Sequence, residues 1–177
     1  MTLNKKSDAI KTQMERIRKR IVSDQIVLQD LDNTLNAVLR QEEERQQFIN
    51  SKEIIQLITT GTGKSVDMST IKRWADKGYL GPVYDEREKF PALSLGSGKQ
   101  RNVYERSIVL KFLFERRYIR PIFEVLDLVR IKTCPDSPAG TIIRSHLGAA
   151  GFEYSVQRED NNKIFEDIAE DQVESIP

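Results

Sequence analysis

Cysteine is almost absent from this sequence, and no apolar run approaches the length of a membrane-spanning helix. The single Cys134 cannot form an intramolecular disulfide, which excludes the disulfide-stapled class of small secreted domains. The N-terminus also lacks the pattern of a signal peptide. We therefore expect a cytoplasmic protein that does not associate with membranes, in which Cys134 is a small, partly buried thiol.

Histidine is equally scarce, because His146 is the only one in the chain. A histidine-based metal cluster is therefore not expected, and His146 is interpreted as a surface or partly packed ring instead of a ligand. The segment from Gly61 to Ser65 resembles the end of a phosphate-binding loop, but the full pattern needs a glycine where Ile58 stands. We expect no catalytic residue, cofactor or metal, and a nucleotide-dependent enzyme is the least favoured alternative.

Glycine and proline are both missing from residues 1–60, which predicts a long helix followed by the start of another. A single helix cannot bury a long apolar stripe in water, so we expect a coiled-coil homodimer. The alternative is a helix that folds back on its own domain, since Val22, Ile26 and Val27 widen the stripe. Asp24 interrupts the d positions. The a and d positions of the stripe are otherwise Ile10, Met14, Ile17, Ile21, Leu28, Leu31, Leu35 and Val38.

Charge is distributed unevenly along the chain. Lysine and arginine minus aspartate and glutamate give balances of +1 for residues 1–48, +6 for residues 49–132 and −6 for residues 133–177. A basic middle segment is what neutralisation of phosphates requires. The acidic C-terminal segment indicates a different module.

The basic middle begins with a segment, residues 51–80, that predicts two short helices joined by a tight turn. Ser51 is expected to cap the first helix and Gly61 and Gly63 to end it, and Asp67 or Ser69 to cap the second. In the second helix the apolar residues share one face and the cations project from the other. Such a pair suits a helix-turn-helix, whose second helix enters the major groove of DNA. The alternative is an ordinary helical hairpin with solvated cations.

Three segments that follow one another strengthen the first interpretation. Thr70 to Leu80 reads TIKRWADKGYL, Arg101 to Tyr104 reads RNVY, and Val109 to Val129 reads VLKFLFERRYIRPIFEVLDLV. In this order they resemble the second helix, the wing end and the next two helices of the MerR-like winged helix-turn-helix family. The resemblance covers about residues 50–130 and implies sequence-specific binding to double-stranded DNA, with transcription regulation as its use.

Residues 90–104 are expected to form the β-hairpin wing of such a domain. Ser69, Lys72 and Arg73 are assigned to base edges, and the remaining cations with Tyr104 to the sugar-phosphate backbone. Thr70 belongs to the same helix face. The complete set of expected DNA-binding residues is Lys64, Ser69, Thr70, Lys72, Arg73, Lys77, Lys99, Arg101 and Tyr104.

Beyond the wing, helices are predicted for Arg106 to Glu115 and from Pro121 to about Val129. After Lys132 the chain becomes irregular, with a possible short strand over residues 152–156. The acidic residues 159–175 are interpreted as a disordered tail or a short amphipathic helix. Such a tail would dock a protein partner or compete with DNA for the basic face.

The expected fold is mainly α: a winged helix-turn-helix with a small β-hairpin wing, preceded by a long N-terminal helix. Its domains are 1–48 for dimerisation, 49–132 for DNA binding, and 133–177 as an irregular segment with an acidic tail. The expected function is a nucleoid-associated, dimeric transcriptional regulator that is not an enzyme. Repression is favoured because no effector pocket or metal-ligand cysteines are evident. The alternatives are an architectural, segregation or mobile-element accessory protein that nucleates an assembly on DNA, and a pure protein-interaction module.

Overall fold

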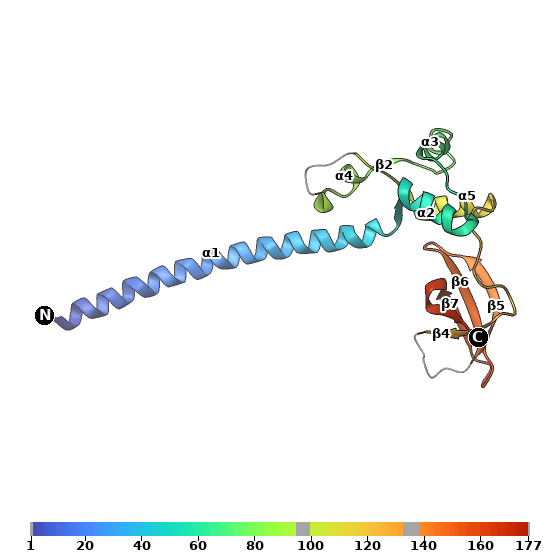
Figure 1. The fold of residues 1–177 in the computed structure, drawn as a ribbon. Coiled ribbons are helices and arrows are strands. Elements are labelled where there is room, and N and C mark those ends of the chain that lie inside the picture. The colour runs from blue at the N-terminus through green and yellow to red at the C-terminus, as the bar shows by residue number, and fades with distance from the viewer. Residues whose placement is uncertain (1, 95–99, 133–138, 177) are drawn as a thin grey trace.

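The computed structural model describes residues 2–94, 100–132 and 139–176, with the side chains of residues 2–6 left out. The chain forms a long N-terminal helix, a helical unit with a small sheet, and a larger antiparallel sheet (Figure 1). The helical unit lies between the other two parts. Its position therefore joins the expected dimerisation element to the C-terminal sheet.

Helix α1 (Thr2–Arg45) confirms the predicted long helix and has 44 residues. At 1.5 Å per residue it is about 66 Å long. It extends away from the rest of the chain and does not fold back over it (Figure 1). The apolar stripe is therefore exposed to solvent. Seven of its eight residues, from Ile10 to Leu35, are between 49 and 61 % exposed, and Val38 is half-buried.

Helices α2 (Ser51–Thr62) and α3 (Met68–Asp76) form the expected helix-turn-helix arrangement. The cap of α2 is Asn50 and not Ser51, because the Asn50 side chain accepts hydrogen bonds from the backbone N–H groups of Lys52 and Glu53. The Glu53 carboxylate accepts the N–H of Asn50 in return, at 2.7 Å. Gly63 ends α2 in the left-handed region, at φ +68°, as predicted, whereas Gly61 lies within the helix and does not end it.

A three-stranded sheet supports the two helices, with the strand order β1 (Phe48–Asn50), β3 (Asn102–Glu105), β2 (Tyr84–Asp85). The predicted wing hairpin over residues 90–104 is wrong in its first strand. β3 pairs with β1 and β2 and not with a strand that begins at residue 90. Helix α4 (Glu86–Lys89) and the 3-10 helix η1 (Pro91–Leu93) follow β2 instead. Phe90 is buried against Phe48 and Val103, so its side chain belongs to a small hydrophobic core, and its residue is not part of a β-strand.

Helix α5 (Arg106–Glu115) confirms the predicted helix over those residues. The next predicted helix, from Pro121 to about Val129, is wrong. Leu126 has a positive φ of 81°, which breaks any helix there. Residues 128–131 instead form strand β4, in which buried and exposed residues alternate as in a half-buried strand.

The C-terminal third of the chain is a five-stranded antiparallel sheet and not an irregular acidic tail. Its order is β7 (Ile164–Ala169), β6 (Phe152–Arg158), β5 (Gly140–Leu147), β4 (Leu128–Ile131), β8 (Val173–Ser175), and a 3-10 helix, η2 (Glu170–Gln172), joins β7 to β8. The mainly α prediction is therefore wrong, and the protein is mixed α/β. Val173 is buried at 3 % exposure opposite Ile131, which explains why the acidic end of the chain is ordered.

One cluster of buried side chains runs through both the helical unit and the sheet. Ile119 follows α5 and is 8 % exposed, and Phe114 meets Phe152 edge to face with ring centroids 5.6 Å apart. Tyr154, fully buried in β6, donates a 2.5 Å hydrogen bond to Glu170. Burial and this hydrogen bond both raise the pKa of the Tyr154 hydroxyl far above its usual value. The sheet is thus packed against the helices and is not a separate tail.

The C-terminal end of α1 is fixed to the helical unit through Arg45, whose side chain is only 19 % exposed. Its Nε donates a 2.7 Å hydrogen bond to Glu86, and its Nη1 donates a 2.9 Å hydrogen bond to the Phe48 carbonyl. Its Nη2 lies 3.8 Å from a carboxylate oxygen of Glu53. One guanidinium therefore joins α1, β1, α2 and α4.

Two further contacts fix the last turns of α1. Glu44 forms a 2.8 Å ion pair with Lys89, and this contact raises the pKa of the Lys89 ammonium. The Gln41 side chain accepts a 2.8 Å hydrogen bond from the backbone N–H of Ala92. The joint between α1 and the helical unit thus occupies residues 41–45.

The close approach of α2 to residues 118 and 119 predicts a cost for Gly61→Ala. An alanine Cβ would collide with the Tyr118 carbonyl oxygen. Replacing a helical glycine by alanine normally stabilises a protein by about 0.5–1 kcal/mol. Here we expect the free energy of unfolding, measured with urea, to fall by about 1–3 kcal/mol, because the backbone of α2 or of residues 118 and 119 must move to make room. The exposed neighbour is the control: Thr60→Ala should change stability by no more than about 0.5 kcal/mol.

The Arg45 joint predicts a loss of stability for Arg45→Met, which keeps the length of the side chain but removes its hydrogen-bond donors. Glu86 is only 24 % exposed and would lose its partner, so we expect a loss of about 1–3 kcal/mol in urea-induced unfolding. Arg40 is an exposed arginine on the same helix. An equal loss for Arg40→Met would contradict the role given to the joint.

Candidate nucleic-acid interface

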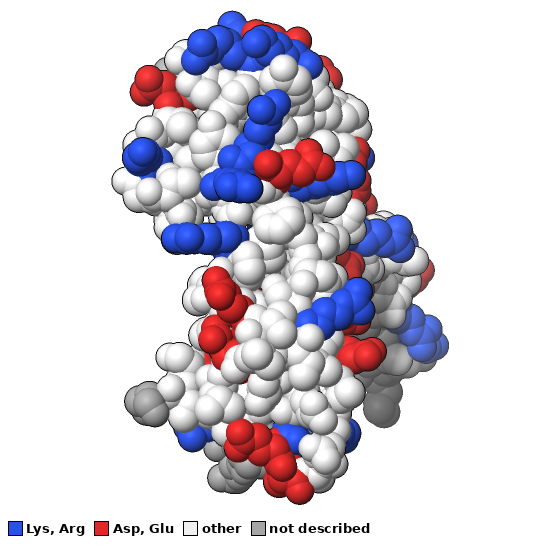
Figure 2. All heavy atoms as spheres, turned by 90° about the vertical axis from the view of Figure 1, so that its right-hand side faces the viewer, with Lys and Arg blue, Asp and Glu red and all other residues white. Residues whose placement is uncertain are grey.

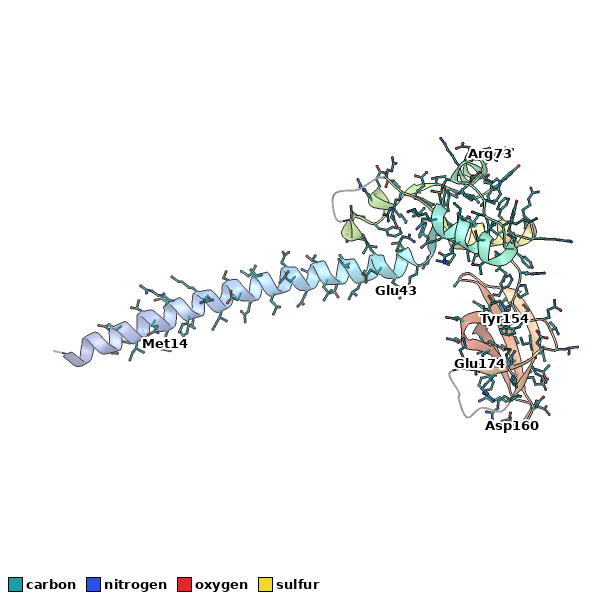
Figure 3. The ribbon with its side chains drawn as sticks, in the orientation of Figure 1. Met14, Glu43, Arg73, Tyr154, Asp160 and Glu174 are labelled. Atoms are coloured by element: carbon teal, nitrogen blue, oxygen red, sulfur yellow. The ribbon has the colours of Figure 1, made fainter. Side chains whose placement is uncertain are left out.

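One face of α3 is buried and the other is open to solvent. Ile71 is fully buried, and Trp74 packs edge to face on Phe112 with ring centroids 5.2 Å apart. These contacts turn the polar side of α3 outward, at the outer edge of the helical unit, where Figure 3 labels Arg73. The exposed residues on that side are Ser69, Lys72, Arg73, Asp76 and Lys77.

A groove of about 480 Å³ lies beside the exposed face of α3. Its walls come from three segments: the start of α2, the N-terminal half of α3, and the chain that enters β3. Lys72 and Arg101 were both predicted to bind DNA, and the fold brings them to the same groove. The lining residues are Asn50, Ser51, Lys52, Met68, Lys72, Gln100, Arg101 and Asn102.

The groove is positively charged. Lys52, Lys72 and Arg101 line it, and none of the described lining residues is acidic. Among the described residues, none of these three cations has a salt-bridge partner, whereas Arg45 and Lys89 at the α1 joint are paired. Unpaired exposed cations remain available to neutralise an external anion such as a phosphate.

The remaining predicted cations lie outside this groove. Lys64 is exposed in the turn between α2 and α3, and Lys77 is exposed at the C-terminal cap of α3. Arg73 donates a 3.2 Å hydrogen bond to the hydroxyl of Thr70, which orients its side chain along the helix. Lys99 lies outside the described residues.

The predicted role of Tyr104 as a contact to the DNA backbone is wrong. Tyr104 is only 2 % exposed, so its ring cannot reach a DNA backbone. It belongs to the main core, and its hydroxyl ends 3.5 Å from Oγ of Ser51 at the groove wall. Val103 and Tyr104 are adjacent in β3 and both buried, because Val103 packs in the small core with Phe48 and Phe90 while Tyr104 packs in the main core. Tyr104 therefore supports the groove from below and does not contact a ligand.

Sequence reasoning missed Lys52, Gln100 and Asn102. Lys52 was placed at the start of the first helix, with Ser51 as its cap, and was not assigned to DNA. The true cap at Asn50 places Lys52 in the first helical turn beside β3. The signal was the pair Asn50 and Glu53, which forms a capping box.

The glycine-rich segment from Gly61 to Ser65 comprises the last two residues of α2 and the first part of the turn that leads to α3. A phosphate-binding loop instead connects a strand to a helix. In this chain Thr62 donates a 2.7 Å hydrogen bond to the carbonyl of Ile58, and its hydroxyl accepts the N–H of Lys64 at 3.1 Å. The segment forms the helix-turn-helix turn.

The surface charges follow the division of the fold. Figure 2 shows lysine and arginine side chains over the upper part of one face, formed by the helical unit, and acidic side chains more often over the lower part, formed by the sheet. The basic side of the molecule thus coincides with the helix-turn-helix.

Comparison with protein-family models, with curated proteins and with solved structures finds no match for this chain. The resemblance to the MerR-like family therefore stays a prediction. Within the described part of the chain, every helix is too short or too polar to cross a membrane.

Proposed function

We propose that this protein is a homodimeric, sequence-specific double-stranded DNA-binding protein that regulates transcription. The observation that carries the proposal is the groove in which Lys52, Lys72 and Arg101 meet beside the exposed face of α3. It combines the two requirements of a DNA reader, which are cations for phosphates and a polar helix face for base edges. The fold stays mixed α/β, with a helix-turn-helix as its DNA-binding element.

The two kinds of contact are assigned to different residues. Ser69 and Arg73 lie on the outward face of α3, where a helix inserted into the major groove presents its side chains to bases. Lys52 and Arg101 lie on the groove walls away from α3, where they would hold the backbone strand that borders the same major groove. Lys72 stands between the two sets, and Lys64 and Lys77 extend the backbone contacts.

Helix α1 supplies the dimer. Seven of the eight residues of its stripe stay exposed within their own chain, and a second copy offers a matching stripe of the same length. Asp24 already has an intrachain partner, since Arg20 lies 3.8 Å away, and that ion pair reduces the cost of an acid in the stripe. A dimer with two equivalent α3 helices would bind two half-sites related by symmetry.

The ground for favouring repression no longer holds. A cavity of about 570 Å³ lies between the helical unit and the sheet, with Arg120, Glu124 and Phe152 among its lining residues. This volume is within the range of small-molecule sites. A regulator whose DNA binding responds to a ligand is therefore as compatible with the fold as a simple repressor.

The DNA proposal predicts different behaviour for Arg73→Ala and Arg101→Ala. A site is first selected from a random DNA pool with the full-length chain, and affinity for it and for random DNA is then measured by fluorescence anisotropy. Arg73→Ala should remove about 1–3 kcal/mol of discrimination between the two DNAs. Arg101→Ala and Lys52→Ala should weaken binding to the selected site and to random DNA equally. Each should also reduce the slope of log affinity against log salt concentration by about one.

The control is Arg144→Ala, which removes an exposed arginine from the C-terminal sheet and should change neither quantity. Equal effects of Arg73→Ala and Arg101→Ala would refute the division of roles. Salt-sensitive binding without any selected motif would point to the architectural alternative, and no binding at low salt would point to a protein-interaction module.

The dimer proposal predicts that removing residues 2–40 produces a monomer, as measured by analytical ultracentrifugation. This truncation keeps the joint at residues 41–45, so the DNA-reading unit should remain folded by circular dichroism. Affinity for a paired site should fall at least about tenfold, because the second half-site no longer binds within the same complex.

A point variant tests the stripe itself. Leu28→Lys places a charge at an a position and should dissociate the dimer, whereas Gln29→Lys places it off the stripe and should not. A truncated protein that is still dimeric, or a full-length chain that is monomeric, would show that α1 is not the dimerisation element.

A further inference from the structure

Three side chains from neighbouring strands meet at one edge of the five-stranded sheet. His146 in β5 is the direct cross-strand partner of Glu153 in β6, and Asp167 comes from β7 on the other side of β6. The three strands lie side by side (Figure 1). One imidazole nitrogen and two carboxylate oxygens, all within 4.8 Å of one another, therefore face a common point.

The separations of these atoms fit a metal ion better than a hydrogen bond. His146 Nε2 lies 3.3 Å from Glu153 Oε2 and 3.6 Å from Asp167 Oδ1. Charge-assisted N–H···O bonds are shorter, at about 2.7–2.9 Å. Ligand atoms at about 2.0–2.2 Å from a tetrahedral zinc ion lie about 3.3–3.5 Å from one another. The ring and the carboxylates thus stand at the spacing of adjacent ligands.

The ring presents only one nitrogen to this point. His146 Nδ1 is buried and has no hydrogen-bond partner among the described residues. Nε2 is therefore the nitrogen that faces the carboxylates. The His146 and Glu153 side chains are 30 and 27 % exposed, so a cation could enter from solvent and still be partly shielded from it.

The absence of a side chain at Gly148 leaves room for one carboxylate, and a bulge in β7 sets the position of the other. Glu153 lies directly over Gly148, where any Cβ would collide with its carboxylate. Asp167 sits in a bulge of β7, because two residues there oppose the single Ser155 of β6, and its φ is +55°. The glycine and the bulge bring the two acids to the same side of the sheet as His146.

We propose that His146, Glu153 and Asp167 form a binding site for one divalent transition-metal cation, with zinc as the preferred ion. A mixed set of one imidazole and two carboxylates suits zinc and its neighbours in the first transition series, whereas calcium and magnesium prefer oxygen ligands alone. Three protein ligands leave a fourth position for water. The bound ion would tie β5, β6 and β7 together and remove the repulsion between the two carboxylates.

The test is titration of the chelator-treated, full-length protein with zinc chloride by isothermal titration calorimetry and thermal unfolding. We expect one zinc ion per chain and a rise in Tm of about 5 °C at saturation. Cobalt should produce the visible absorption of a tetrahedral site. Calcium or magnesium that binds as tightly as zinc would overturn the proposal, since the ring would then contribute nothing.

Variants locate the site. His146→Gln should abolish zinc binding and the cobalt spectrum, and Asp167→Asn, at a 70 % exposed side chain that does not support the fold, should weaken binding at least about tenfold. Glu166→Gln removes the same charge from the next residue and should leave the affinity within about twofold. Cys134→Ser should also bind normally. Zinc binding that survives His146→Gln, or that disappears in Cys134→Ser, would place the ion elsewhere and overturn the assignment.

Discussion

The position of the helical unit relative to the long helix depends above all on one partly buried guanidinium. Arg45 ends α1, yet its hydrogen bonds reach Glu86 and the Phe48 carbonyl, and Glu53 lies close by. A lysine could not replace Arg45, because its ammonium group is a compact charge and lacks the planar, forked set of donors that makes these contacts. Because the joint fixes the last turn of α1, the orientation of α1 is passed to α2 and α3. Two chains joined along α1 would therefore hold their α3 helices in a defined relation, which is what recognition of a symmetric DNA site requires.

The bare stripe on α1 and the open groove beside α3 are two surfaces of different chemistry on one chain. Helix α1 presents an apolar row over residues 10–38, about 42 Å at 1.5 Å per residue, that water cannot solvate well, so its free energy falls when another apolar row covers it. The groove has the opposite character, because its unpaired cations stay hydrated until a polyanion replaces the water and the counterions. The first surface is suited to a second protein chain and the second to nucleic acid. The two proposed interactions would not compete, since the joint at residues 41–45 separates the two surfaces.

Sequence patterns predicted the local elements near the N-terminus well and the C-terminal sheet poorly. The heptads of α1, the glycines that bound α2 and α3, and the apolar spacing of α5 are short-range signals, and the structure agrees with them. Leu126 and Val129 also fit a helical period, but long-range pairing with β5 and β8 overrides it. Tyr104 was misassigned because β3 is covered on both sides, so that Val103 and Tyr104 are both buried, and this packing cannot be read from the chemistry of the tyrosine. The groove combines Lys52 with Arg101, a pairing that only the β1–β3 register creates.

The same limit explains why His146 was interpreted as an ordinary ring. A metal site read from sequence needs ligands at a recognisable spacing, and His146, Glu153 and Asp167 are separated by intervals that carry no such pattern. Their meeting depends on the cross-strand pairing of β5 with β6 and on a bulge in β7. The sheet that contains them packs on the helical unit through Phe114 and Phe152. A cation that stiffens β5, β6 and β7 would therefore stiffen the surface on which α5 rests, and α5 in turn supports α3 through the contact of Phe112 with Trp74.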